Sequence, residues 1–163
     1  MRVASHKRLA IDGGMPAPAL LTIDLNALAA NFRTLEAFGG VPVHPVVKAD
    51  GYGLGAAACS RRLMAEGART FFVARTREGE RLRAALGGDA AIYVLDGCLT
   101  GRATRLRAAG LRPVLNTDAQ LIEWRAAGGG PCGLQIDTGM NRLGFRVDDA
   151  PDAFEGLELV LSH

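Results

Sequence analysis

The sequence alternates between short apolar runs and longer runs with a helical period, and this alternation restricts the fold more than any other feature. The helical segments lie between the apolar runs and repeat their apolar residues at intervals of three and four. Parallel strands need a crossover connection, usually a helix, so this alternation is typical of parallel βαβ units. We therefore predict an α/β fold with six strands, at residues 43–48, 70–74, 91–95, 112–115, 133–137 and 157–161.

The predicted helices have recognisable starts. Asp24, a residue type that favours the N-cap, precedes an amphipathic run that ends near Gly39. Thr117 and Gln120 have the spacing of a capping box. Residues 1–19 show no apolar period and contain several glycines and prolines, so we predict a flexible leader there and an ordered domain over residues 20–163. The remaining helices are expected at residues 56–66, 76–86, 100–109 and 117–127.

Two architectures produce such a pattern: the open doubly wound sheet and the eight-stranded (β/α)8 barrel. The pattern alone does not separate them. A barrel typically takes about 250 residues, so six strands in 163 residues would form an incomplete one. The sequence also stops in or just after the run at residues 157–161, where a natural domain rarely ends. We interpret the chain as truncated.

Composition narrows the functional classes. A sequence with 48% hydrophobic and 22% charged residues is typical of a soluble globular protein. Nineteen Lys and Arg against 17 Asp and Glu, with the arginines scattered, do not indicate a nucleic-acid-binding surface. Cys59, Cys98 and Cys132 are too far apart to suggest a disulfide framework or a metal site. No apolar run approaches the roughly 20 residues of a membrane span, so we expect a cytoplasmic protein.

Lys48 ends the first apolar run, at the mouth of the predicted sheet. Burial beside Val46 and Val47 would lower the pKa of a lysine from about 10.4 toward neutrality, and only the neutral amine can form a Schiff base. The alternative is an ordinary strand-end lysine that reaches into solvent. Position alone favours the alternative, and only the surrounding motif reverses that preference.

Gly51, Gly53 and Gly55 follow Lys48 and precede a predicted helix. Their spacing differs from that of dinucleotide-binding motifs. Contact with a phosphate and a simple need for a tight turn explain them about equally well. Tyr52 lies between the glycines, and its hydroxyl is suited to bind a phosphate or a substrate at the strand mouth.

A second polar turn follows the strand predicted at residues 133–137. It contains Asp137, Asn141 and Arg142, and the guanidinium of Arg142 could bind a carboxylate or an aromatic oxygen. The alternative is a loop held by its own side chains, and both interpretations stay open. His163 ends the last predicted strand, where a lone histidine is more often structural.

Together these segments resemble the alanine racemase family. The run Val46–Gly55 is similar to the motif around the lysine that binds pyridoxal phosphate (PLP) in that family, and Gln135–Gly144 is similar to its second motif. The opening Thr22–Leu28 resembles the family's first helix, and Leu161–His163 resembles its histidine-bearing strand. The resemblance runs from about Leu20 to the end, and it implies the N-terminal part of a (β/α)8 barrel without the family's C-terminal β domain.

The resemblance also implies roles for individual residues. Lys48 would hold PLP as an internal aldimine and later act as a base on one face of the substrate α-carbon. Tyr52 would bind the cofactor phosphate, and His163 would lie against the pyridine ring. Val46 and Leu95 would line the pocket.

Arg142 would bind the phenolic oxygen of PLP and help to place the substrate carboxylate. Several family members carry a carbamylated lysine at the position of Gln135, and that group orients the arginine. A neutral glutamine cannot supply the same charge. Arg142 would then need an anion or a different partner.

The implied activity is the interconversion of L-alanine and D-alanine, which supplies D-alanine for bacterial cell-wall synthesis. In the family a tyrosine from the C-terminal domain of a partner subunit is the second base, so we expect a homodimer and an inactive isolated chain. A broad-specificity racemase or a decarboxylase of the same fold, and a non-catalytic PLP-binding protein, are the alternatives. A dinucleotide-binding module would rest on the glycines alone.

Overall fold

The computed structural model describes residues 5–7 and 21–163. Strand β1 (Ser5–Lys7) pairs antiparallel with β2 (Leu21–Ile23). The rest of the leader predicted for residues 1–19 lies outside the described residues, so its flexibility stays a prediction.

Helix α1 (Leu25–Gly39) begins where the sequence predicts. The Asp24 carboxylate accepts hydrogen bonds from the backbone N–H groups of Asn26 and Ala27 at 2.8 and 3.1 Å, which confirms the predicted N-cap. The helix ends at Gly40, which adopts a left-handed conformation with φ of 63°.

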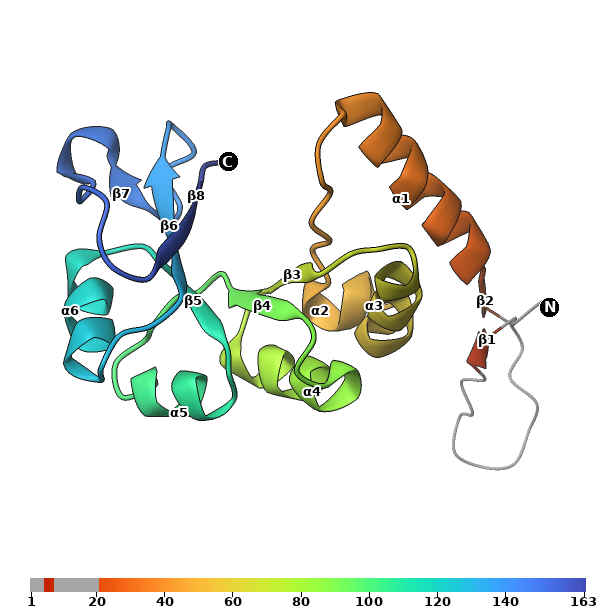
Figure 1. The fold of residues 1–163 in the computed structure, drawn as a ribbon, viewed down its shortest axis with the longest axis horizontal. Coiled ribbons are helices and arrows are strands. Elements are labelled where there is room, and N and C mark those ends of the chain that lie inside the picture. The colour runs from red at the N-terminus through yellow and green to blue at the C-terminus, as the bar shows by residue number, and fades with distance from the viewer. Residues whose placement is uncertain (1–4, 8–20) are drawn as a thin grey trace.

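A parallel sheet forms the centre of the fold (Figure 1). Its strands pair in the order β3-β4-β5-β6, and β6 also pairs with both β7 and β8. Five of the six predicted strands are confirmed, and the two-residue β7 is an addition within a predicted loop. The strands are β3 (Thr70–Val73), β4 (Ala91–Val94), β5 (Arg112–Leu115), β6 (Cys132–Asp137), β7 (Phe145–Arg146) and β8 (Leu157–Leu161).

The sixth predicted strand, at residues 43–48, is wrong except for one bridge between Val46 and Phe72. In this bridge the Val47 N–H donates to the Phe72 carbonyl and the Phe72 N–H donates to the Pro45 carbonyl. Pro45 has no N–H to extend the ladder, and the chain turns away at Lys48. The strand therefore cannot grow in either direction.

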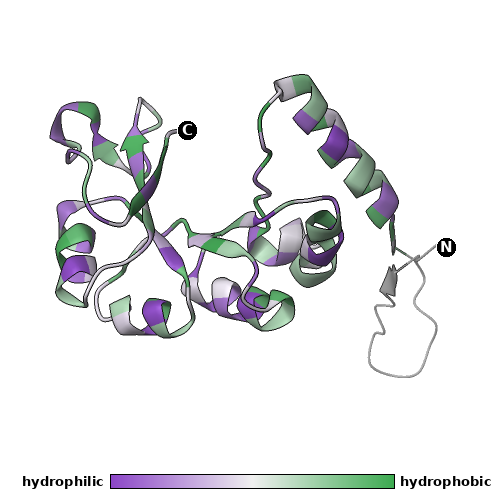
Figure 2. Cartoon of the chain, in the orientation of Figure 1, coloured by the Kyte–Doolittle hydropathy of each residue, from purple (hydrophilic) through white to green (hydrophobic). Residues whose placement is uncertain are grey.

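Helices α3 (Ala56–Ala65), α4 (Thr76–Leu86), α5 (Ala103–Ala108) and α6 (Asp118–Ala126) follow in the predicted order. Figure 2 shows both hydrophobic and hydrophilic residues in these helices, and in each helix only a minority of the residues are buried. None of the helices in the described ranges combines the length and the apolar character needed to cross a bilayer.

The hydrophobic core lies between this sheet and its helices. Alternate residues of the strands are buried there because successive strand side chains point to opposite faces. Phe71 and Val73 of β3 and Ile92 and Val94 of β4 are completely buried, together with Leu106 of α5. Phe72 and Tyr93, which alternate with these residues, therefore belong to the opposite face.

On that opposite face three strands contribute a polar cluster. The Tyr93 hydroxyl of β4 donates a hydrogen bond to the Glu158 carboxylate of β8 at 2.6 Å. Arg112 of β5 forms an ion pair with the same carboxylate oxygen, also at 2.6 Å. The rings of Phe72 and Tyr93 stack with their centroids 5.2 Å apart. The cluster joins β4, β5 and β8 across the sheet.

In this environment Tyr93 is expected to lose its proton at a higher pH than an exposed tyrosine. Burial disfavours the phenolate and the Tyr93 proton is shared with Glu158, so the pKa rises from 10.0 to about 12. Because the folded-state pKa is the higher one, the neutral phenol stabilises the fold fully below about pH 10. That contribution is lost as the pH rises through about 12. Residues 1–163 contain two tyrosines, so ultraviolet titration of the Tyr52→Phe variant of this 163-residue chain should report Tyr93 alone, and a midpoint near 10 would contradict this burial.

Candidate active site

A cavity of about 500 Å³ opens at the carboxyl ends of the strands, where parallel α/β folds place their functional groups. The structure brings together the six residues to which the family resemblance gives a role, although they come from different segments of the chain. The lining includes Val46, Lys48, Tyr52, Leu95, Arg142 and His163.

Lys48 opens an unusual turn, α2 (Lys48–Tyr52). Ala49, Asp50 and Gly51 all adopt left-handed conformations with φ between 51° and 65°, and Tyr52 continues them with φ of 55°. A left-handed conformation costs an ordinary residue roughly 1–2 kcal/mol. Four consecutive left-handed residues are therefore costly, and Gly51 relieves the strain at one of the four positions. The turn persists only where its surroundings hold it.

Hydrogen bonds within the segment hold part of this turn. The Gly51 N–H donates to the Val47 carbonyl at 2.9 Å, and the Gly55 N–H donates to the Asp50 carbonyl at 2.7 Å. The Asp50 carboxylate accepts from the Ala56 N–H at 2.9 Å and so joins the turn to the start of α3. Gly53 and Gly55 have φ of 85° and 93°, which favour glycine, so the turn itself requires these glycines. Their contact with a phosphate stays a prediction.

The Lys48 side chain is half-buried, and its Nζ lies 5.9 Å from the centre of the Tyr52 ring. Val47 is buried in the core, whereas Val46 is 43% exposed on the cavity side. The expected apolar surroundings of Lys48 are thus present on one side only. The reason is strand alternation, which sends these two valines to opposite faces.

The loop after β6 is held by its own side chains, as one of the two sequence interpretations requires. The Asp137 carboxylate accepts from the N–H groups of Gly139 and Asn141 at 2.9 and 3.0 Å. These hydrogen bonds hold the pKa of Asp137 below its ordinary value, and the one from Gly139 has the largest effect. Asn141 itself has φ of 58° and donates to the Gly139 carbonyl. The loop is a fixed platform for the residue that follows, Arg142.

Arg142 reaches the cavity from this platform. None of the acidic side chains in residues 21–163 forms an ion pair with it. Gln135 lines the same cavity and is 6% exposed. The guanidinium charge is therefore available to an anion in the cavity, which agrees with the expectation drawn from Gln135.

The turns at this rim are tied to one another. Arg75 pairs with the Asp96 carboxylate at 3.0 Å, and the Gln120 side chain donates to the Asp96 carbonyl, also at 3.0 Å. Thr117 accepts from the Gln120 N–H, but the Gln120 side chain accepts from Asn116 instead of completing the predicted capping box. The side chain that would have closed the box bridges two turns instead.

Several cavity residues were not anticipated from the sequence. Phe72, Asp96 and Ser162 line the cavity, and Ser162 shares a hydrogen bond of 2.6 Å with Thr138. Each lies within two residues of the carboxyl end of a strand, and that position is the signal that could have found them. Within the described ranges, no group of three or more His, Cys, Asp and Glu side chains is arranged to hold a metal ion.

Comparisons with known proteins agree with this geometry. The family model "Alanine racemase, N-terminal domain" matches residues 23–160. The chain is 47% identical over 158 residues to an alanine racemase of Methylobacterium nodulans, and 45% identical over 161 residues to a catabolic alanine racemase of Mesorhizobium japonicum. These matches cover 89% and 90% of the chain but 42% of each relative. The chain thus spans less than half the length of these relatives.

A solved structure supports the same conclusion. The alanine racemase of Bartonella henselae, described with covalently bound pyridoxal phosphate, superposes with a TM-score of 0.71 at 34% identity. The superposition covers 78% of this chain and 37% of that one. The predicted fold is confirmed, because the parallel sheet is part of a TIM-type barrel that stays open in this chain. The chain belongs to the alanine racemase family and corresponds to its N-terminal domain.

Proposed function

We propose that the protein is a PLP-dependent alanine racemase that interconverts L-alanine and D-alanine. The observation that carries this proposal is the convergence of Lys48, Tyr52, Arg142 and His163 on one cavity at the strand ends. Lys48 is the only lysine in residues 21–163, so it is the only side-chain amine there that could form a Schiff base.

The donor set of the cavity fits PLP. Lys48 offers the amine for the aldehyde, Tyr52 offers a hydroxyl for the phosphate, and Arg142 offers a positive charge that no acidic side chain of residues 21–163 pairs with. His163 and the apolar walls Val46 and Leu95 would flank a flat ring. When bound, the cofactor supplies an electron sink for the charge left at the α-carbon.

The residues of this chain would then have the following roles. Arg142 fixes an anionic oxygen and so orients the substrate. Lys48 would hold the cofactor aldehyde and, as a free amine, would take the α-proton from one face and return it. Inversion requires a proton donor on the opposite face, and we propose that a second copy of the protein supplies it in a homodimer.

We also propose a cytoplasmic location and a role in supplying D-alanine for cell-wall synthesis. The relative from Mesorhizobium japonicum is described as catabolic, so a role in alanine breakdown is the competing physiological role. Growth of a deletion strain with and without added D-alanine would separate the two roles. Dependence on D-alanine supports the biosynthetic role.

The activity is tested with the protein expressed at the full length that its gene encodes. We expect PLP-dependent loss of optical activity from either enantiomer of alanine, and a much smaller rate with bulkier amino acids. Equal rates across a panel of amino acids would indicate a broad-specificity racemase. Binding of PLP without turnover of any amino acid would contradict the proposal and favour a non-catalytic PLP-binding protein.

A further inference from the structure

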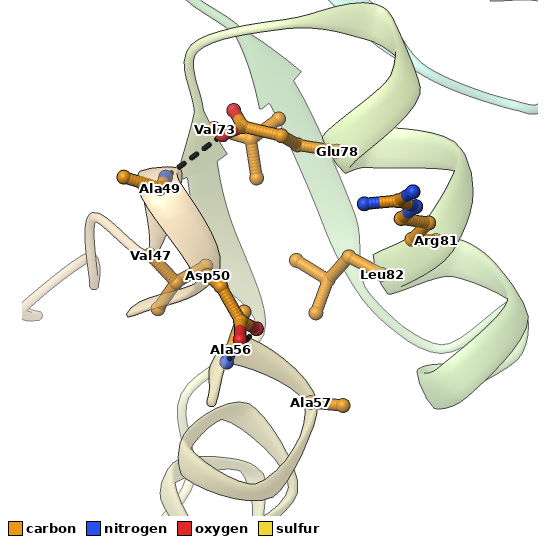
Figure 3. Close-up of a pocket in the computed structure, with 9 residues that line it drawn as sticks. All are labelled: Val47, Ala49, Asp50, Ala56, Ala57, Val73, Glu78, Arg81 and Leu82. Atoms are coloured by element: carbon orange, nitrogen blue, oxygen red, sulfur yellow. Dashed lines mark hydrogen bonds between the residues drawn. The ribbon is translucent and has the colours of Figure 1, made fainter. Parts of the chain in front are cut away.

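The turn that carries Lys48 is joined to helix α4 by one acidic side chain. Oε1 of Glu78 accepts a hydrogen bond from the Ala49 N–H at 2.8 Å, and Ala49 directly follows Lys48 (Figure 3). The other carboxylate oxygen accepts from the N–H groups of Ala74 and Arg75 at 2.8 and 3.0 Å. Glu78 therefore links the Lys48 turn to the end of β3 and the start of α4.

Side-chain packing provides little support for the turn on this side. A cavity of about 470 Å³ lies between the turn and α4, lined by Val47, Asp50, Glu78, Arg81 and Leu82 among others (Figure 3). Packed side chains would resist displacement of the turn, but an open space does not. The hydrogen bond from Ala49 to Glu78 crosses this space and ties the two walls together.

Ala49 is also the first of the left-handed residues, with φ of 51° and ψ of 46°. Its N–H belongs to the planar peptide group that joins Lys48 to Ala49. An acceptor fixed at this point therefore holds the plane from which the left-handed turn starts. The same peptide plane limits the direction in which the Lys48 side chain leaves the backbone.

We propose that Glu78 is a positioning residue of the active site, which holds the Lys48 turn in its left-handed form so that the Lys48 amine faces the cofactor cavity. The inference deepens the proposed function and rests on it. Glu78 acts through the backbone of Ala49 and is not expected to touch cofactor or substrate.

The carboxylate is suited to this role because it has two acceptor oxygens facing two separate groups of N–H donors. In Glu78→Gln one oxygen becomes an NH2 group, which would face an N–H and lose one of the two connections. Glu78→Asp keeps the charge and the acceptors for the first turn of α4 but is one methylene too short to reach Ala49. Glu80→Gln is the matched control, because Glu80 lies on the same helix and pairs with Arg105, away from Lys48.

Two measurements test the proposal on the protein at its encoded length. The first is hydrogen exchange at the Ala49 amide without PLP. The second is the rate at which PLP followed by borohydride labels Lys48, detected by mass spectrometry. A hydrogen bond to a charged group corresponds to a factor of about ten or more. We expect exchange to be about tenfold faster and labelling about tenfold slower in Glu78→Gln and Glu78→Asp, with Glu80→Gln unchanged.

The outcomes separate this inference from the proposed function. If wild-type Lys48 is labelled and both Glu78 variants are labelled equally fast, Glu78 only caps α4 and the inference fails. If neither the wild type nor any variant is labelled, the proposed PLP chemistry fails. This holds even if the Glu78 variants change the hydrogen exchange of Ala49. A Glu78→Gln protein that does not fold leaves Glu78→Asp, which retains the cap, to decide between these results.

Discussion

Replacement of Lys48 with alanine is expected to abolish both the covalent attachment of PLP and alanine racemisation. Among residues 21–163 the substitution removes the only side-chain amine at the cavity, and with it the base for one face of the α-carbon. Loss of a residue that is both attachment point and acid–base group should lower kcat at least about 1000-fold. Racemase assays with saturating PLP measure this loss.

The sequence provides a sharp control for that experiment. It contains only two lysines, Lys7 and Lys48. Within residues 1–163, borohydride reduction of the PLP-loaded protein should therefore label a single tryptic peptide, the one that contains Lys48. The Lys7→Ala variant should keep both label and activity. A label on Lys7, or full labelling of the Lys48→Ala variant, would show that Lys48 is not the cofactor lysine.

Gly144→Ala is expected to destabilise the fold by about 3 kcal/mol and to displace Arg142. Gly144 has φ of 115°, which an alanine rarely adopts. A Cβ atom there would lie 2.8 Å from the Asp137 backbone nitrogen and 3.0 Å from the Gln135 carbonyl oxygen. Backbone strain of about 1–2 kcal/mol is thus added to an overlap that costs about 1–3 kcal/mol. The backbone of β6 cannot move aside, so the loop must.

Gly139→Ala is the matched control because Gly139 belongs to the same loop. Gly139 has φ of 129°, but a Cβ atom there would meet no other atom within 4 Å. This variant should be destabilised by the backbone strain alone, about 1–2 kcal/mol. Urea denaturation compares the free energies of unfolding, and PLP titration reports the effect on Arg142. Equal destabilisation by both substitutions would show that the overlap at Gly144 is relieved without cost.

Much of the secondary structure could be predicted because it depends on local pattern. The strands at residues 70–74, 91–95 and 112–115 and the N-cap at Asp24 were all predicted closely. The strand at residues 43–48 was not, because apolar content does not show whether a run finds a partner along its whole length. The role of the Gln120 side chain was also missed, because its partner Asp96 lies in a different turn.

The sequence by itself determined the alternation of strands and helices, the identity of the chemically capable residues and the likeness to the alanine racemase family. Only the tertiary structure decided how those residues meet. In the left-handed turn after Lys48, the Ala49 N–H donates a hydrogen bond to Glu78, 29 positions away. The Tyr93 hydroxyl donates to Glu158, 65 positions away. The physical reason is range: periodicity reports the surroundings of one segment, whereas these contacts depend on the register and curvature of the whole sheet.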